Sequence, residues 1–250
     1  FGEDKLIVVA GNSYQIPDKI KLKDLIKYDL LDSYNLINQE FKFVIMFGAD
    51  DNSENDTFAS KYQKVEYIES HGTEYIDTGY KPNRKTNINC LFSISTFASN
   101  SFIFGVYGTT NKYGVNYSGS NTYAPRFEHQ TNQKSIQFSQ NVKYISSFID
   151  GKIYHNNTLE YDYSNIGQFN VDYNLFLFVL NNAGSLQYYS NIKMFSCKIY
   201  DNDILVRDFV PCYRKSDNVI GMYDLVGKRF YTNSGTGTFS KGSNVHKYML

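Results

Sequence analysis

The spacing of acidic residues is the first test for hydrolytic chemistry in this chain. Glu160 and Asp162 are two positions apart, which would place both carboxylates on one face of a strand. Hydrolysis of a glycosidic bond needs two carboxyl groups that face each other across a cleft. A third acid further along the strand would complete a hydrolase pattern, but that position is Asn165. We therefore expect Glu160 and Asp162 to be exposed carboxylates at a strand edge, and we assign no catalytic residue.

The histidine, cysteine and oxygen-donor patterns add no catalytic or metal site. The histidines stand apart without a nearby nucleophile signature, so each is expected on the surface or in a loop: His71, His129, His155 and His246. Asp172, Asn181 and Asn182 carry oxygen donors that suit Ca²⁺, but they form no dense acidic loop, and we expect no metal or other cofactor. The three cysteines lack metal-ligand spacing. One disulfide between Cys197 and Cys212 is left open, although buried free thiols are favoured.

Tyrosine and asparagine are abundant in this chain, and Tyr123 and Arg126 lie in a polar segment that we expect to be a loop. Flat aromatic rings stack on the C–H groups of sugars, and planar amides or guanidinium groups bond to hydroxyls. The candidate ligand-binding residues are Tyr113, Tyr117, Tyr123, Arg126, Asn181, Asn182 and Tyr188. Tyr123 and Arg126 are the preferred pair. Because tyrosine and asparagine are abundant everywhere, a structural role stays open for all of them, and the absence of tryptophan argues against tight binding.

The overall charge and hydropathy exclude two classes of partner. The chain has 25 basic and 25 acidic residues and a formal net charge of +0. Binding to nucleic acid needs a concentrated basic surface, so nucleic acid is not expected as a partner. No apolar run reaches the 18 or more residues of a membrane-spanning helix. The abundance of Tyr and Phe favours strands.

Residues 1–60 are expected to form a small unit of their own. Lys5–Ala10 and Phe41–Phe47 have strand patterns, and a short helix is favoured from Leu22 to Leu31. The polar and acidic stretch 48–56 is typical of a linker, so we place a domain boundary near residue 60. Such a short unit cannot bury a large core alone, and we expect it to attach the protein to an assembly.

From residue 61 to residue 242, strand-like runs alternate with turn signals, as in an all-β sandwich or barrel. Asp150-Gly151 supplies the positive φ angles that a two-residue type I′ turn needs, and hairpin turns are also predicted at Asn202-Asp203 and Gly227-Lys228. Leu175–Leu180 is apolar on both faces and predicts a central strand. Further strands are expected at 101–107, 112–117 and 134–138, and residues 243–250 are left as a tail.

Several segments of this region carry a resemblance to a known fold. The opening segment Tyr67–Gly79 reads Tyr-Ile-Glu-Ser-His-Gly-Thr-Glu-Tyr-Ile-Asp-Thr-Gly, and Phe209–Phe239 closes the region. Between them lie Ile149–Lys152, Leu175–Phe178 and Cys197–Pro211. As a set, these segments resemble the concanavalin A-like, laminin G-like jelly-roll domains of bacterial surface proteins and bacteriophage virions. The resemblance implies an all-β sandwich of two antiparallel sheets with a concave face. It also implies that the acidic residues of the opening segment have a structural role.

The resemblance implies no single activity, because the superfamily spans lectins, hydrolases and structural decorations. We expect a non-catalytic carbohydrate- or surface-binding module of an extracellular or phage virion protein, displayed on a virion or bacterial cell surface. Its partners would be a cell-surface glycan or host surface and, through residues 1–60, other virion or surface-assembly subunits. A homo-oligomer is left open. The alternatives are a purely structural domain without glycan binding and, less favoured because of Asn165, a polysaccharide hydrolase.

Overall fold

The computed structural model describes residues 7–10, 12–13, 42–44 and 55–245. The chain separates into two compact units, residues 1–60 with 247–250 and residues 61–246. In the first unit, β1 (Ile7–Ala10) pairs antiparallel with β2 (Asn12–Ser13) and β3 (Lys42–Val44). Both strands predicted there therefore form over part of their length. The helix expected from Leu22 lies outside the described residues.

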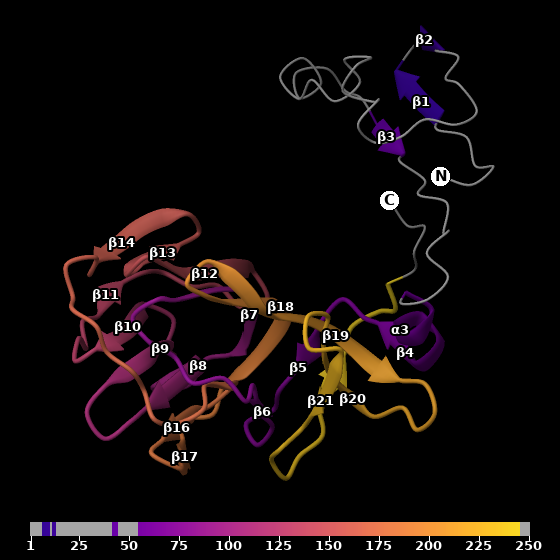
Figure 1. Ribbon diagram of the computed structural model, residues 1–250. Coiled ribbons are helices and arrows are strands. Elements are labelled where there is room, and N and C mark those ends of the chain that lie inside the picture. Colours follow the sequence, from indigo (N-terminus) through magenta and orange to yellow (C-terminus); the bar gives the residue numbers. More distant parts are fainter. Residues whose placement is uncertain (1–6, 11, 14–41, 45–54, 246–250) are drawn as a thin grey trace. The chain divides into compact units, whose positions relative to one another are not determined.

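The second unit is a sandwich of two sheets, which lie face to face in Figure 1. The smaller sheet has eight strands, and its path runs in the order β11 (Lys134–Ser135), β10 (Thr122–Glu128), β9 (Lys112–Ser118), β8 (Ser101–Tyr107), β15 (Phe176–Leu177) and β6 (Ile76–Asp77). Beside β8 lies β16 (Leu180–Asn182), which pairs with β17 (Ser185–Gln187). Apart from the parallel pairing of β16 with β8, these strands are antiparallel.

The larger sheet has eleven strands. Its path runs in the order β14 (Thr158–Asp162), β13 (Lys152–His155), β12 (Lys143–Ile149), β7 (Thr86–Thr96), β18 (Asn191–Asp201), β19 (Ile204–Arg214), β20 (Ile220–Asp224) and β21 (Arg229–Thr232). A short helix, α3 (Asn55–Lys61), leads into β4 (Tyr62–Lys64), which pairs with β19. The remaining strands, β5 (Ile68–Glu69) and β22 (Ser240–Lys241), pair with each other, and β5 also pairs with β18. The expected all-β, two-sheet antiparallel sandwich is confirmed.

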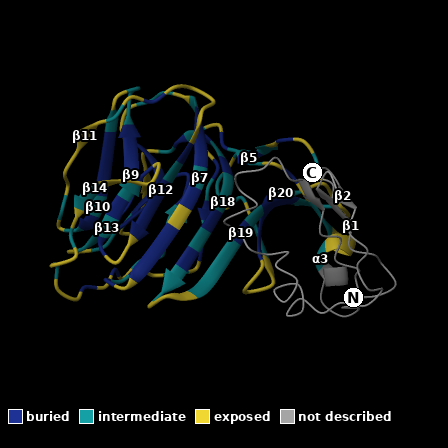
Figure 2. Ribbon diagram, turned by 90° about the horizontal axis from the view of Figure 1, so that it is seen from above, coloured by how far each residue is buried: buried dark blue, intermediate teal, exposed yellow. Residues whose placement is uncertain are grey.

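The core lies between the sheets because side chains alternate along each strand. On β7, Ile88, Cys90, Phe92 and Ile94 are buried on the side that faces the smaller sheet. Aromatic rings fill much of this space, and the Phe148 ring contacts those of Phe104, Tyr113 and Phe127 at centroid distances of 5.5, 5.1 and 6.3 Å. Figure 2 shows the buried residues concentrated along the central strands, among them β7 and β9.

The hairpin turns form where the sequence places them. Asp150 and Gly151 have φ angles of 51° and 75°, and Asn202 and Asp203 have φ angles of 47° and 66°. Both residues of each turn therefore adopt the positive φ that a type I′ turn requires. The third hairpin joins β20 to β21 as predicted, but its connection begins earlier, at residue 225, because β20 ends at Asp224, and Lys228 there has a φ of 50°.

The single strand expected over Leu175–Leu180 is wrong. Phe178 has a φ of 72°, which is unusual for a bulky residue and breaks the extended conformation. The segment therefore divides into β15, which is antiparallel to β8, and β16, which is parallel to it. Both parts stay buried, so the apolar character of the segment reflects its place in the core.

Two further expectations need correction on the grounds of burial. His155 is 5% exposed and lies among the rings of Tyr123, Phe138 and Tyr144, so it is a core histidine and not a surface or loop one. The Glu160 side chain is 7% exposed and pairs with Lys134, so this carboxylate ties β14 of the larger sheet to β11 of the smaller one.

Residues 243–245, expected to be part of a tail, are paired with the start of the domain. The backbone N–H of Val245 donates to the carbonyl of Lys64 at 2.9 Å, and that of Glu66 donates to the carbonyl of Ser243 at 3.0 Å. An isolated antiparallel bridge joins Val65 to Asn244. No helix among the described residues has the length and apolar character needed to cross a membrane.

Candidate functional site

A groove of about 420 Å³ opens on the outer face of the larger sheet. Three adjacent central strands, β12, β7 and β18, form its floor, and the turn that follows β18 contributes one wall. The lining residues are Asn87, Ile88, Asn89, Phe148, Ile149, Ser196, Lys198, Tyr200 and Asp203. Ile88 and Phe148 point into the core, so the polar residues that alternate with them form the surface of the groove.

Strand register places polar side chains in one row across this face. Ser147 of β12 is directly opposite Asn89 of β7, and Asn89 is opposite Lys198 of β18. Lys198 is in turn opposite Asp208 of β19, and on the other side Ser147 is opposite Tyr154 of β13. The row thus holds an aromatic ring, a hydroxyl, an amide, an ammonium group and a carboxylate over five neighbouring strands, of which the Ser147 hydroxyl is buried.

The Asn87 side chain fixes one end of the groove. Its Nδ2 donates to Asp203 Oδ1 at 3.0 Å, and its Oδ1 accepts a hydrogen bond from the backbone N–H of Asp150 at 2.8 Å. One buried amide therefore holds together the turn after β12 and the turn after β18. This end of the groove is rigid, because both turns are also closed by their own strand pairs.

In the middle of the groove lie hydrogen-bonding groups that have no partner in the described part of the chain. Asn89 is exposed, and no other group of the described chain hydrogen-bonds to its amide or to the hydroxyl of half-buried Tyr200. Lys198 Nζ lies 3.1 Å from Asp208 Oδ2, and the Lys198 side chain is 45% exposed whereas that of Asp208 is 14% exposed. Amides both donate and accept, and ammonium groups donate up to three bonds. The set suits a ligand rich in neutral hydroxyl groups.

The acidic residues do not form a hydrolytic pair at this groove. Asp203 is the one carboxylate in the groove lining among the described residues, and its Oδ1 accepts from Asn87.

Glu74, in the opening segment, lies outside the groove lining. Burial raises the pKa of Glu74, but hydrogen bonds from the backbone N–H groups of His71 and Thr73 outweigh this and lower its pKa below the usual value. In the part of the chain that the structure describes, no three His, Cys, Asp or Glu side chains gather to hold a metal ion.

Three of the candidate tyrosines have no exposed ring face. Tyr113, Tyr117 and Tyr123 are fully buried in the core. Their hydroxyls bond to the carbonyls of Thr86 and Thr96 and to the hydroxyl of Ser146, at 2.9, 3.3 and 2.7 Å respectively. Burial raises the pKa of Tyr117 to about 12. This corrects the expectation that they contact a sugar, since residues at odd positions of β9 and β10 point inward with Val115 and Phe127.

The other four candidates lie on the smaller sheet and its hairpin, and their sugar-binding role stays a prediction. Arg126 Nε donates to the Tyr107 hydroxyl at 2.9 Å, and its Nη1 donates to two backbone carbonyls. Asn181 is 3% exposed and bonds to the backbone at residues 174 and 184, while the Asn182 amide donates to Gln187. Tyr188 is 48% exposed and stacks on Phe102 at a centroid distance of 6.3 Å. The groove lining contains none of these four residues.

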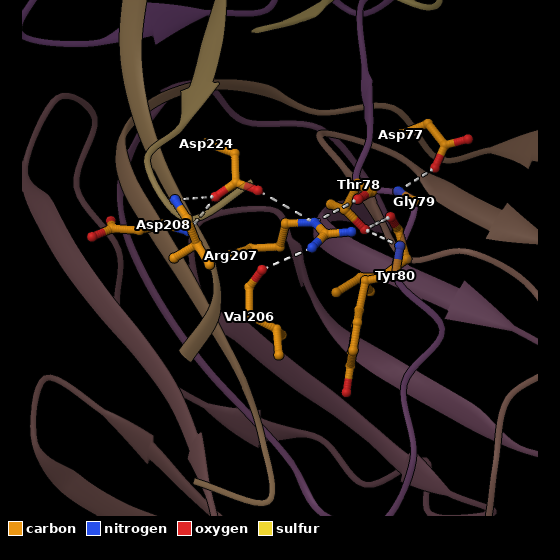
Figure 3. A network of polar contacts seen from close by, with 10 residues as sticks. Asp77, Thr78, Gly79, Tyr80, Val206, Arg207, Asp208 and Asp224 are labelled. Carbon is orange, nitrogen blue, oxygen red and sulfur yellow. Dashed lines mark hydrogen bonds and ion pairs between the residues drawn. The ribbon is translucent and has the colours of Figure 1, made fainter. Parts of the chain in front are cut away.

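The opening segment that carries the fold resemblance meets its closing partner in a polar cluster, drawn in Figure 3. Arg207 Nε donates to the carbonyl of Thr78 at 3.2 Å and lies 3.6 Å from Asp224 Oδ2. The other carboxylate oxygen of Asp224 accepts from the backbone N–H groups of Asp208 and Val226, at 2.9 and 3.0 Å. Figure 3 shows the Asp208 carboxylate turned away from Arg207. The cluster fastens the segment after β6 to β19 and β20.

The sandwich has a counterpart among solved structures. It is a putative carbohydrate binding protein from Bacteroides ovatus ATCC 8483, and the two chains are similar with a TM-score of 0.51 and 12% sequence identity. The likeness is one of fold. It covers 73% of this chain and 62% of that chain, so this protein spans less than two thirds of its neighbour's length. No protein-family model and no curated protein sequence matches the chain.

The groove residues were missed in the sequence, although one signal for them was present. Asn87 and Asn89 alternate with Ile88 and Cys90, which is the pattern of a strand with one wet face. Lys198 and Tyr200 alternate in the same way with Cys197 and Ile199. The alternation alone does not show that these two strands are neighbours, and the groove exists because they pair.

Proposed function

We propose that residues 61–245 form a non-catalytic carbohydrate-binding module that holds a neutral glycan in the groove of the larger sheet. One observation carries this proposal: Asn89 and Tyr200, diagonal neighbours on adjacent strands of one sheet face, present an amide and a hydroxyl that no other group of the described chain uses. The register Tyr200↔Asn87 and Lys198↔Asn89 fixes their spacing through the backbone ladder. The sheet already holds the backbone of both residues, so binding of a sugar has only the rotamers of their side chains to order.

The fold comparison supports the class of ligand. The solved neighbour is named a putative carbohydrate binding protein, and its sandwich aligns with most of this chain. The row from Tyr154 to Asp208 crosses five strands, a distance of about 19 Å, which suits an oligosaccharide. In this proposal the protein acts outside the cell, on a virion or bacterial surface, and residues 1–60 attach it to its assembly.

The direct test is a glycan array with the full chain, followed by titration of the best ligand. The double variant Asn89→Ala/Tyr200→Ala should bind about tenfold more weakly or worse, because two hydrogen-bonding groups and a ring are removed. Tyr188→Ala is the matched control, since this tyrosine is exposed on the other sheet. The control should bind like the native protein.

The other outcomes have definite meanings. Loss of binding in Tyr188→Ala with retention in the groove variant would move the site to the smaller sheet, where Arg126 lies. An array without binding, from protein that unfolds cooperatively, would contradict the proposal and favour a purely structural domain.

A further inference from the structure

The geometry points to a disulfide bond between Cys90 and Cys197 in the core of the sandwich. Cys90 lies in the middle of β7 and Cys197 in the middle of β18, and the register of the two strands pairs them directly. Directly opposite residues of an antiparallel pair have Cα atoms about 4.5 or 5.5 Å apart. Both values fall within the range of roughly 4.4–6.8 Å that disulfides span.

The two sulfur atoms are close together. Cys90 Sγ lies 2.9 Å from Cys197 Sγ. Non-bonded carbon atoms prefer separations of about 3.5–4.0 Å, and sulfur is the larger atom, so the thiols are compressed. Both side chains are fully buried and point into the same layer of the core. Closing the bond needs only a small movement of two side chains that already face each other.

The third cysteine is not an alternative partner for this pair. Cys197 is opposite Phe209 on β19, and Cys212 is three positions further along that strand. Three positions correspond to about 10 Å, which exceeds the roughly 7 Å limit for a disulfide. All three cysteines are buried and free in the structure, as the sequence favours. The bridge between Cys197 and Cys212 that the sequence left open is ruled out by this distance, and the proposed bond joins β7 to β18 instead.

The bond would form by thiol–disulfide exchange with a small-molecule disulfide such as oxidised glutathione. One protein thiolate attacks the disulfide and releases one small thiol, and the second protein thiolate displaces the other, so two protein protons leave with two small thiols. In the native state the Cys90 thiol is fully buried, which slows such attack. Formation therefore belongs to folding, before the two sheets close over the pair.

The test uses the native full chain refolded with a mixture of reduced and oxidised glutathione. We expect one free thiol per chain after denaturation, from Cys212, and a non-reduced proteolytic digest in which the peptides containing Cys90 and Cys197 are linked. Three free thiols in refolded protein, or a link that includes Cys212, would overturn the inference.

A thermal measurement supplies an independent readout. The bond closes a loop of about 100 residues, so reduction of the oxidised protein should lower the Tm on the order of 10 °C. Cys212→Ala should keep this response and lose its last free thiol. Cys90→Ala/Cys197→Ala should show no response to reductant. An equal response in that double variant would assign the effect to something other than this bond.

Discussion

Two ion pairs made by consecutive residues of β19 differ in what they can do. Arg207 pairs with Asp224, whose side chain is 0% exposed, and the same guanidinium donates to the carbonyl of Thr78. Asp208, the next residue, turns to the outer face and pairs with Lys198, which is 45% exposed. The first pair is fixed by several partners at once, whereas the second is open to water at the edge of the groove.

The difference shows that the availability of a polar group decides its role more than its type does. Arg126 and Asn181 have the chemistry of a sugar site, but their hydrogen bonds are largely taken by the protein itself. Asn89 and Lys198 have no better chemistry, yet they lie where a ligand can reach them. Four predictions would break or sharpen this contrast.

The largest effect is expected at Asp224. Asp224→Ala removes the acceptor of two backbone N–H groups and leaves Arg207 without its carboxylate, so we expect the free energy of unfolding to fall by roughly 3–5 kcal/mol. Denaturant unfolding measures this. Lys198→Ala, which breaks the exposed pair, should cost less than about 1 kcal/mol. Equal costs for the two variants would remove the contrast between the pairs.

A smaller loss is expected from Tyr123→Phe. The variant deletes the hydroxyl that bonds to Ser146 at 2.7 Å and leaves a buried serine without that partner, so we expect a loss of about 1–2 kcal/mol. Glycan affinity should not change, because the ring is buried. Weaker glycan binding with unchanged stability would show that Tyr123 reaches the ligand after all.

Asp208→Asn tests the ion pair of Asp208 with Lys198. Its effect on unfolding should stay below about 1 kcal/mol, since the Lys198 end of the pair is exposed and the backbone N–H of residue 208 still donates to Asp224. Freed from its carboxylate, Lys198 should bind acidic sugars more tightly than in the native protein, and the gain should fade at high salt. An unchanged preference between neutral and acidic sugars would show that Lys198 lies outside the contact area.

The smallest effect is expected in the pH dependence of stability. Burial lowers the pKa of His155 below its usual value, and Glu160 opposes this only in part. The folded state then binds fewer protons than the unfolded chain between that lowered pKa and about 6.5. The contribution of neutral His155 is fully present above about pH 6.5 and is lost as the pH falls towards the folded pKa.

Urea unfolding of the native protein and of His155→Phe, at several values between pH 5 and pH 8, separates this contribution from other titrations. The native protein should lose more stability on acidification than the variant does. Parallel pH profiles would mean that His155 titrates as it does in the unfolded chain.

The features that the sequence predicts correctly are local. The turns at Asp150-Gly151 and Asn202-Asp203 depend on φ angles that these residues adopt at little cost, so no distant contact is needed to predict them. The break at Phe178 is different, because its positive φ is imposed by pairing of the flanking residues with β8 on both sides of the break. An apolar run alone does not predict that its two halves will pair with the same strand in opposite directions.

The site shows the same limit. Tyr113 and Tyr117 share the phase of Val115, so the alternation within β9 places them inward, although their residue type also suits sugar stacking. Asn89 and Lys198 belong to strands far apart in the sequence. Their meeting depends on the pairing of β7 with β18, which neither segment encodes alone.

The pairing of residues 64–66 with 243–245 has a mechanical consequence. Both ends of the domain leave from the same antiparallel bridge, with Val65 opposite Asn244. A force applied between these two ends would act on the bridge in an unzipping geometry, in which the hydrogen bonds break one after another. It would not act in a shear geometry, in which all of them are loaded together. The domain would therefore yield first at this bridge, and the neighbouring ladder between β4 and β19 would carry the load next.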